Sequence, residues 1–302
     1  MRQPLSGINA FDPNRVIGAT LGSATLLREL ARGSMGVVFD AYQQSLKRRI
    51  AVKILPKCLY TAESIRLFEQ EAEAVASLSH PNIVPIYEIG ETPEFRWFSM
   101  QLIEGPSLAE LLRKTALNPV PSRRTLSLRT ALSLVRQILE ALGFAHRRQV
   151  VHRDIKPENI LITGESLIPV ITDFGIARIV SAPADAMTIA RGSPLYMAPE
   201  QVLSPEIDFR ADIYAAGVLL FRLVVERLPL MAHASAQVLL KAKVAGRKIF
   251  TRLPSQTNPR LSPDMDALIE RATAQDPSAR FPSCRDFLAA LSGYEAKHLR
   301  LN

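Results

Sequence analysis

The feature that most constrains this chain is a pair of short apolar segments, NILI (residues 159–162) and PVIT (residues 169–172). Short runs rich in β-branched residues, separated by a few polar residues, are typical of a β-hairpin. Such a hairpin would bring Asn159 and Asp173 to the same end. Asn and Asp offer hard oxygen ligands, which suit Mg²⁺ bound together with phosphates. The spacing therefore predicts a metal and phosphate site at one end of a hairpin.

Asp154 lies five residues before Asn159, and its neighbours include three basic residues: His152, Arg153 and Lys156. A surface carboxylate in this setting would form an ion pair of little consequence. Beside a phosphate site, however, Lys156 can reach the transferred phosphate. Asp154 is then placed to orient an attacking hydroxyl and to accept its proton.

A second phosphate-binding pattern lies near the N-terminus. Gly33 and Gly36 separate two strand-like segments, where glycine lets backbone N–H groups approach phosphate oxygens. An ordinary hairpin turn would use the same residues.

Lys53 ends a strand predicted to alternate, and its ammonium group could reach either solvent or the phosphates. Glu71 lies on the apolar face of a helix predicted over residues 61–78, where a carboxylate needs a cation, so we expect Lys53 and Glu71 to pair.

The chain divides into two parts near Glu104. From residue 26 to residue 103 the segments are short and strand-like, apart from the one helix. After Glu104, the capping-box spacing of Ser107 and Glu110 and the helical stripe in residues 130–146 predict helices. Beyond residue 200 the pattern is helical with Pro-rich turns, and residues 118–127 are expected to form an exposed loop.

Composition excludes little. The chain has 302 residues, is 47% hydrophobic and has a formal net charge of +8, which allows a large core and favours anionic partners without choosing among them. Such a charge is most often only a solvated surface. The two cysteines, Cys58 and Cys284, form no metal or redox spacing and fit a reducing compartment, so we expect a cytoplasmic protein.

Neither of two apolar segments predicts a membrane span. Residues 213–225, IYAAGVLLFRLVV, are interrupted by Arg222 and shorter than the roughly 20 residues that a span needs, so they predict a buried helix. Residues 16–27, VIGATLGSATLL, resemble a signal-peptide core. They run directly into the glycine pattern, which needs a strand before it, and this favours a strand.

Taken together, the motifs resemble the catalytic domain of eukaryotic-type (Hanks-type) serine/threonine protein kinases. They are ARGSMGVV (31–38), IAVK ending at Lys53, Glu71 ahead of LSHPNIV, HRDIKPEN (152–159), DFG (173–175), APE (198–200), ADIYAAGVLLF (211–221) and DPSARF (276–281). The resemblance spans residues 26–291, and the wording of HPNIVPIYEIGE and MAPEQ is most like bacterial members. Eight motifs in order leave little room for another fold.

The resemblance implies an α+β, two-lobed protein kinase fold. It has a small antiparallel-sheet N-lobe with one main helix and a larger, mainly helical C-lobe. The expected boundaries are an N-terminal extension (1–25), the N-lobe (26–103), the C-lobe (104–292) and a C-terminal tail (293–302).

The resemblance also implies a role for each motif residue. Catalytic roles fall to Asp154, Lys156, Lys53, Glu71 and Ser193, and metal binding to Asn159 and Asp173. ATP contacts fall to Leu30, Ala31, Arg32, Gly33, Ser34, Met35, Gly36, Val37, Val38, Ala51 and Lys53, and to the hinge residues Met100, Gln101 and Ile103. Structural or regulatory roles fall to His152, Arg153, Phe174, Gly175, Thr188, Glu200, Asp212 and Arg280, with Asp212 bracing the catalytic loop and Arg280 pairing with Glu200.

Two positions depart from the family pattern. Ala31 replaces the first glycine of the loop, and Gln101 stands where an acid is common. We expect little loss of nucleotide affinity, because the two inner glycines remain and the hinge holds adenine through backbone groups. In the activation segment, Thr188 is the favoured phosphate acceptor, with Ser181 weaker, and Arg153 is the expected cation partner.

The function implied is transfer of the ATP γ-phosphate to protein Ser/Thr hydroxyls, with Mg²⁺, or Mn²⁺ in its place, as cofactor. Autophosphorylation through a transient homodimer is expected. A pseudokinase scaffold, a related small-molecule kinase and a nucleic-acid-binding protein are the alternatives. The first lacks support because Lys53, Asp154, Asn159 and Asp173 are all present. Small-molecule kinases generally lack the APE segment and its arginine partner, and nucleic-acid binding rests on charge alone.

Overall fold

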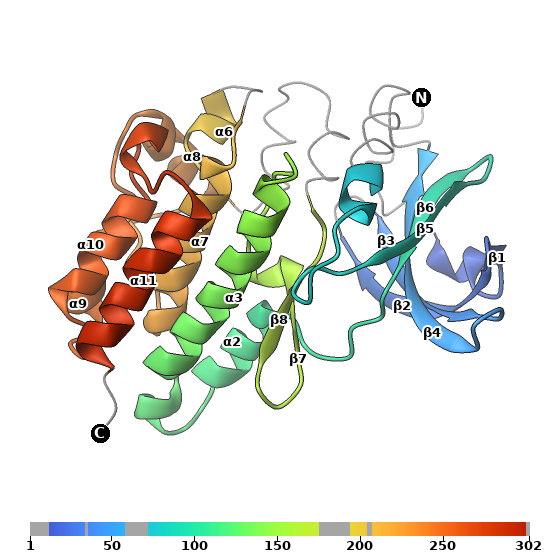
Figure 1. Cartoon of the computed structure of the whole chain (residues 1–302), viewed down its shortest axis with the longest axis horizontal. Coiled ribbons are helices and arrows are strands. Elements are labelled where there is room, and N and C mark those ends of the chain that lie inside the picture. The colour runs from blue at the N-terminus through green and yellow to red at the C-terminus, as the bar shows by residue number, and fades with distance from the viewer. Residues whose placement is uncertain (1–11, 34–35, 58–71, 175–193, 204–206, 300–302) are drawn as a thin grey trace. The chain divides into compact units, whose positions relative to one another are not determined.

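The structure is a computed structural model that describes residues 12–33, 36–57, 72–174, 194–203 and 207–299 (Figure 1). The described residues up to Glu104 form one compact unit, and those from Gly105 onward form a second. We call them the N-terminal and C-terminal units and describe each by itself.

The N-terminal unit is built on a six-stranded antiparallel sheet with the strand order β1-β2-β3-β4-β6-β5 (Figure 1). Its strands are β1 (Thr20–Leu21), β2 (Ala24–Arg32), β3 (Val37–Gln43), β4 (Arg48–Pro56), β5 (Ile86–Glu91) and β6 (Phe95–Met100). A short 3₁₀ turn, η2 (Pro13–Val16), precedes the sheet. Residues 72–76, the described end of the predicted helix, are helical.

The interior of this sheet explains two sequence patterns. Val16, Leu21, Ala24 and Leu26 lie in its core, so the segment that resembled a signal peptide forms structural strands. β4 pairs with both β3 and β6 and is buried from Ile50 through Pro56. The predicted alternation in β4 was therefore wrong, because a central strand covered on both faces has no solvent side.

The C-terminal unit is mainly helical and carries one two-stranded ladder, β7 (Ile160–Thr163) and β8 (Ile168–Ile171) (Figure 1). Its helices are α2 (Leu108–Ala116), α3 (Leu128–His146), α6 (Glu200–Leu203), α7 (Arg210–Val224), α8 (Ala236–Val244), α9 (Pro254–Thr257), α10 (Pro263–Ala272) and α11 (Cys284–His298). Three 3₁₀ turns complete it: η4 (Pro121–Arg123), η5 (Pro157–Asn159) and η6 (Pro277–Ala279).

Two long helices form the centre of this unit. α3 packs against α7, α11 and β8, and α7 also packs against α10. α7 is buried along nearly its whole length, as the apolar run in the sequence predicted. Gly217 lets α7 approach α10 closely, since a Cβ there would lie 2.6 Å from the Cβ of Ala272.

Several local predictions are confirmed. Ser107 and Glu110 form the capping box that begins α2, and the predicted helix in residues 130–146 is α3. NILI and PVIT pair as the β7–β8 hairpin. The expected exposed loop contains the short turn η4. Within the described ranges, no helix is long and apolar enough to cross a membrane.

The fold class predicted from the sequence is confirmed. An antiparallel sheet forms the N-terminal unit, and helices dominate the C-terminal unit.

Candidate active site

Asp154 lies on a loop of the C-terminal unit, between α3 and the turn η5. Its Oδ2 accepts hydrogen bonds from Lys156 Nζ at 2.6 Å and from Asn159 Nδ2 at 2.9 Å. The Asn159 amide also donates to the backbone carbonyl of Asp154 at 2.8 Å. Because both donors converge on Oδ2, the other oxygen, Oδ1, is the one placed to accept a proton from an incoming hydroxyl.

The β7–β8 hairpin brings Asn159 and Asp173 to one end. Ile160 pairs with Ile171, and the Thr172 N–H donates to the Asn159 carbonyl at 2.9 Å, so Asp173 follows immediately after this closing bond. Asp173 has a φ of 56°, an uncommon conformation for a residue with a side chain. Left-handed backbone at such a position is often retained where a functional side chain must be aimed.

Asp212 braces the loop that carries Asp154. Its Oδ2 accepts from the backbone N–H of His152 at 2.8 Å and from Nε2 of His146 at 2.8 Å, and its Oδ1 accepts from the N–H of Arg153 at 2.7 Å. Arg153 has a φ of 66°, so these bonds hold a turn that would not form unaided. Burial raises the pKa of Asp212, but the hydrogen bond and charge of His146, with those of His152, outweigh it and lower this pKa below its usual value. The carboxylate therefore stays ionised.

His152 links the loop to the hairpin. Its Nε2 lies 3.0 Å from the carbonyl of Thr172, and its ring packs on Phe174 with 4.5 Å between ring centroids. Its Nδ1 accepts from the N–H of Asp154 at 3.2 Å. Burial lowers the pKa of His152, so the ring is neutral at pH 7. With its proton on Nε2, the ring donates to the Thr172 carbonyl and accepts from the Asp154 N–H at Nδ1. His152 therefore connects the loop before the hairpin to the residue after it.

Glu200 and Arg280 form the ion pair that the sequence led us to expect. Arg280 is completely buried and donates to both carboxylate oxygens of Glu200 at 2.7 Å. It also donates to the carbonyls of Ala274, Arg210 and Gln275. This set of acceptors compensates the burial of the guanidinium group and fixes the start of α6.

Two further side chains hold this region that the sequence did not single out. Gln201 donates from Nε2 to the carbonyl of Arg153 at 2.9 Å, and its Oε1 accepts from the N–H of Ala198 at 2.8 Å. Lys243, buried on α8, donates to carbonyls of the segment before Ala198. An available signal was the position of Lys243, four residues after the buried Leu239, on the apolar stripe of α8.

In the N-terminal unit, Lys53 lies in the middle of β4, opposite Val38 on β3 and Phe98 on β6. Its side chain is almost completely buried, so the solvent-exposed alternative does not hold. Ala51, two residues earlier, is buried and pairs with Met100. The register of the sheet thus places Lys53, Val38, Ala51 and Met100 in one area of the unit.

The glycine loop closes between β2 and β3. Arg32 pairs with Val37, and the Gly33 N–H donates to the Gly36 carbonyl at 2.9 Å. A Cβ on Gly36 would overlap the carbonyl oxygen of Ile54, so this position requires glycine. Among the described residues, the nearest atom to a Cβ on Gly33 would be the Gly36 carbonyl oxygen, 4.0 Å away, which leaves open space for a ligand to approach.

The remaining candidate nucleotide residues flank this loop. Leu30 and Ala31 are exposed on β2, and Ala31 follows a register shift in the β2–β3 pairing. At the hinge, the Gln101 N–H donates to the Pro85 carbonyl at 3.1 Å. Its carbonyl is therefore the Gln101 backbone group left for an adenine, next to the buried Met100 and two residues before the half-buried Ile103.

The donor set fits a divalent metal held together with phosphates. Asn159 uses both amide hydrogens on Asp154, so its Oδ1 is the atom that can ligate a cation, and Asp173 offers a carboxylate at the same end of the hairpin. In the part of the chain that the structure describes, no three His, Cys, Asp or Glu side chains gather as a metal site. Mg²⁺ commonly takes one or two protein ligands and completes its shell with phosphates and water, so two oxygen donors suffice.

Six residues assigned from the sequence lie outside the described residues. They are Ser34, Met35, Glu71, Gly175, Thr188 and Ser193. The expected Lys53–Glu71 pair and the catalytic role of Ser193 therefore stay predictions. The same holds for phosphorylation of Thr188 or Ser181.

Comparison with known proteins decides the family. Residues 24–290 match the protein kinase domain family. The chain belongs to the protein kinase family. Members of this family use ATP and divalent metal ions for phosphoryl transfer.

The curated relatives are bacterial serine/threonine-protein kinases. Pkn1 of Myxococcus xanthus is 35% identical over 98% of this chain, and PrkC of Bacillus subtilis is 36% identical over 92%. This chain spans 41% of the length of either protein. The crystal structure of the Mycobacterium tuberculosis PknI kinase domain covers 93% of this chain and is itself covered to 98%, with a TM-score of 0.72 and 26% identity. The predicted likeness to bacterial Hanks-type kinases is confirmed.

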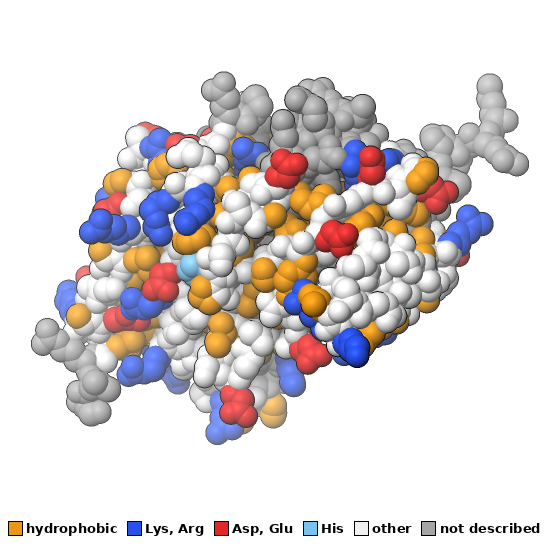
Figure 2. All heavy atoms as spheres, turned by 45° about the vertical axis from the view of Figure 1, so that its right-hand side comes forward, with side chains coloured by type: hydrophobic (Ala, Val, Ile, Leu, Met, Phe, Trp, Pro, Cys, Tyr) orange, Lys and Arg blue, Asp and Glu red, His pale blue; other side chains and the backbone are white. Residues whose placement is uncertain are grey.

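Charged side chains of both signs lie on one face of the molecule (Figure 2). On the face drawn in Figure 2, Lys and Arg side chains are interspersed with Asp and Glu side chains. A nucleic-acid-binding surface instead gathers its cations in a patch or stripe. The charged side chains drawn on this face have the mixed arrangement of a solvated surface.

Proposed function

We propose that this chain is an ATP-dependent serine/threonine protein kinase, which transfers the γ-phosphoryl group of ATP to Ser and Thr hydroxyls of proteins. The observation that carries the proposal is the arrangement around Asp154, where Lys156 and Asn159 bind one carboxylate oxygen and leave the other for a hydroxyl. A carboxylate used only for an ion pair has no need of the second donor from Asn159.

The residues of the C-terminal unit divide the chemistry among them. Asp154 orients the substrate hydroxyl and accepts its proton as the hydroxyl oxygen bonds to phosphorus and ADP leaves. Lys156, whose ammonium group contacts Asp154, offsets negative charge on the transferred group. The oxygens of Asn159 and Asp173 would hold the metal ion. Bound Mg²⁺ would offset the charge of the ATP phosphates, and Mn²⁺ has similar ligand preferences.

The residues of the N-terminal unit contribute nucleotide binding. We propose that the backbone of Gly33 and Gly36 approaches the phosphates and that Lys53 contacts them, held by Glu71. The hinge carbonyl of Gln101 and the backbone of Ile103 would hold adenine. The buried position of Lys53 supports this role, because a buried ammonium group needs anionic or polar partners.

Regulation is proposed to follow from the same loop. Phosphate on Thr188, added by a second copy of the chain in a transient homodimer, would pair with Arg153. Arg153 suits this role because its backbone is fixed by Asp212 and Gln201 at both the N–H and the carbonyl.

The decisive experiment compares the parent protein with Asp154→Asn in an assay with Mg²⁺, labelled ATP and a generic basic protein substrate. Asparagine keeps the size of the side chain but cannot accept the proton. We expect the transfer rate to fall by about 10²–10⁴-fold, with nucleotide affinity nearly unchanged. An equal loss of nucleotide affinity in a titration would make Asp154 a structural residue. A parent protein that binds ATP but transfers no phosphate would instead favour the pseudokinase alternative.

A further inference from the structure

Lys243 is the feature of the C-terminal unit that the proposed chemistry leaves unexplained. It lies near the end of α8 and is 1% exposed. Its Nζ donates to the carbonyls of Pro194 and Leu195, each at 2.8 Å, and to the carbonyl of Met197. A protonated lysine has three N–H groups, so each one has a backbone acceptor.

The segment that Lys243 binds is tied to the catalytic loop at its other end. The N–H of Ala198 donates to Gln201, and Gln201 donates to the carbonyl of Arg153, the residue before Asp154. Residues 194–198 are thus fixed between α8 on one side and the catalytic loop on the other. Leu195 adds an apolar anchor, since it packs against the buried cluster of Leu239, Ala242 and Ile249.

Burial of Lys243 costs free energy, because its charge loses contact with water, and an apolar side chain would avoid that cost. An apolar side chain of similar size would occupy the same volume without desolvating a charge. It would also leave three carbonyls of an irregular segment without donors, and buried carbonyls need partners. The three acceptors therefore account for lysine at this position better than packing does.

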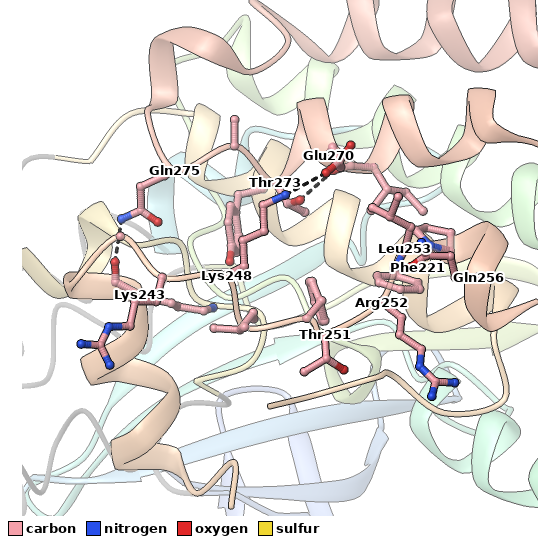
Figure 3. A pocket seen from close by; sticks show the side chains of 18 residues that line it. Phe221, Lys243, Lys248, Thr251, Arg252, Leu253, Gln256, Glu270, Thr273 and Gln275 are labelled. Carbon is pink, nitrogen blue, oxygen red and sulfur yellow. Dashed lines mark hydrogen bonds and ion pairs between the residues drawn. The ribbon is translucent and has the colours of Figure 1, made fainter. Parts of the chain in front are cut away.

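Aromatic and charged groups from several elements lie around Lys243. The ring of Tyr214 on α7 lies 4.8 Å from Nζ, while the other charged groups that act on it are Arg280 and Glu200. Gln275 donates to the backbone carbonyl of Lys243 at 2.6 Å, at the edge of a cavity of about 360 Å³ (Figure 3). Burial and, to a smaller extent, the charge of Arg280 lower the pKa of Lys243 to about 7, while Glu200 opposes the shift.

We propose that Lys243 is a positioning residue that fixes residues 194–198 as the surface on which a protein substrate is held beside Asp154. The proposal rests on the proposed kinase function and deepens it. Within the described residues, the hydrogen bonds of Lys243 Nζ all go to carbonyls of residues 194–198 and none to the candidate nucleotide residues. Its loss therefore weakens use of the protein substrate and leaves ATP binding unchanged.

Protonation controls this contact. The ammonium form supplies three donors to three carbonyls, whereas the neutral amine supplies two donors and turns a lone pair toward the third carbonyl. The carbonyls favour the protonated form and oppose its loss. The segment is therefore held fully at pH below about 7 and less firmly as the pH rises above it.

The test compares the parent with Lys243→Met, with Lys243→Arg and with Lys241→Met, which removes an exposed lysine from the same helix. With a protein substrate, we expect Lys243→Met to raise the KM of that substrate about tenfold or more, because charged hydrogen bonds are lost. The KM for ATP and the rate of ATP hydrolysis without a protein acceptor should stay within about twofold of the parent. Lys241→Met should match the parent in every measurement.

A pH series separates positioning from simple structural support. Between pH 6.5 and 8.5 we expect the substrate KM of the parent to rise, whereas that of Lys243→Arg, whose side chain stays charged, should not follow it. A fall in kcat with no change in the substrate KM, or equal losses toward ATP and protein, would make Lys243 merely structural and overturn the proposal.

Hydrogen exchange tests the positioning of the segment without any measurement of activity. The amides of residues 195–198 should exchange faster in Lys243→Met than in Lys241→Met, and unchanged exchange would overturn the proposal. If the parent transfers no phosphate but exchange in the variant rises, the positioning of the segment stands and the kinase function fails.

Discussion

Lys53 and Asp154 lie in different compact units and are held in place by different forces. Lys53 is fixed by the register of a central strand, between Val38 and Phe98 on its neighbours. Asp154 lies on an irregular loop whose backbone is bound by buried polar side chains, above all Asp212. The candidate nucleotide residues therefore depend on backbone spacing, and the loop that carries Asp154 depends on charge and hydrogen bonding.

This difference predicts which substitutions each unit tolerates. In the N-terminal unit, added volume should do the most damage, because strands must keep their spacing. In the C-terminal unit, replacing a charged side chain by an uncharged one of similar volume should do the most damage, because its partners stay buried and lose their hydrogen bonds. Substitutions in both units can therefore test this contrast.

The largest expected effect is that of Arg280→Met in the C-terminal unit. The substitution keeps much of the volume but leaves Glu200 and three carbonyls without their donor. Loss of one partner of a buried ion pair costs about 3–5 kcal/mol. Denaturant unfolding should show this loss, while Arg285→Met, at an exposed position of α11, should change the free energy of unfolding by less than about 0.5 kcal/mol. Equal stability of the two variants would remove the basis of the contrast.

The sequence already contained much of this contrast. The β7–β8 hairpin, α3 and the capping box of α2 could be predicted because periodicity and end signals are local. The alternation predicted for β4 was wrong because side chains on both of its faces are buried from Ile50 through Pro56. Burial of both faces depends on how the rest of the fold packs around the strand, and the nine residues of β4 do not show this by themselves.

Gln201 and Lys243 escaped the sequence analysis for the same reason. Gln201 donates to the carbonyl of Arg153, 48 residues away in the chain. Lys243 donates to the carbonyls of Pro194 and Leu195, which are 49 and 48 residues away. By contrast, Asp154 and Asn159 were found within one short motif and Asp173 at the start of another, 14 residues after Asn159. The carbonyls that Gln201 and Lys243 bind lie in other elements, so these contacts could not be read from a local pattern.

The second prediction adds one methyl group to either glycine of the N-terminal loop. Gly36→Ala should destabilise the protein by about 1–3 kcal/mol, because its Cβ overlaps the carbonyl oxygen of Ile54 and forces β3 and β4 apart. Among the described residues, the nearest atom to the new Cβ of Gly33→Ala is the Gly36 carbonyl oxygen at 4.0 Å, so this substitution should cost less than about 1 kcal/mol. Thermal unfolding measures both. If Gly33→Ala proved the more harmful, backbone spacing would not be what fixes this loop.

The ATP affinity of the same two variants, measured by nucleotide titration, tests where the phosphates bind. The open space at Gly33 is where a phosphate would approach, so Gly33→Ala should weaken ATP binding although it barely changes stability. ATP affinity unchanged in Gly33→Ala would place the phosphates elsewhere.

The last prediction is a slope of stability with pH that belongs to Lys243 alone. Its pKa is lowered from 10.5 in the unfolded chain to about 7 in the folded protein. Between these values the unfolded chain binds more protons, so the free energy of unfolding rises with pH, by about 1.4 kcal/mol per pH unit at most. Below pH 7 both states are protonated and this contribution is constant.

The difference in stability between the parent and Lys243→Met isolates that slope from other titrating groups. Measured by denaturant unfolding from pH 7 to 9, this difference should shift with pH in favour of the parent, whereas the difference for Lys241→Met should be flat, because Lys241 is exposed in both states. Over the same range the parent should lose affinity for its protein substrate. Stability and substrate binding would thus change in opposite directions, because the proton that is costly to bury is the one that holds residues 194–198. A flat difference for Lys243→Met would mean that this lysine keeps its proton throughout, and that the carbonyls of the segment outweigh its burial.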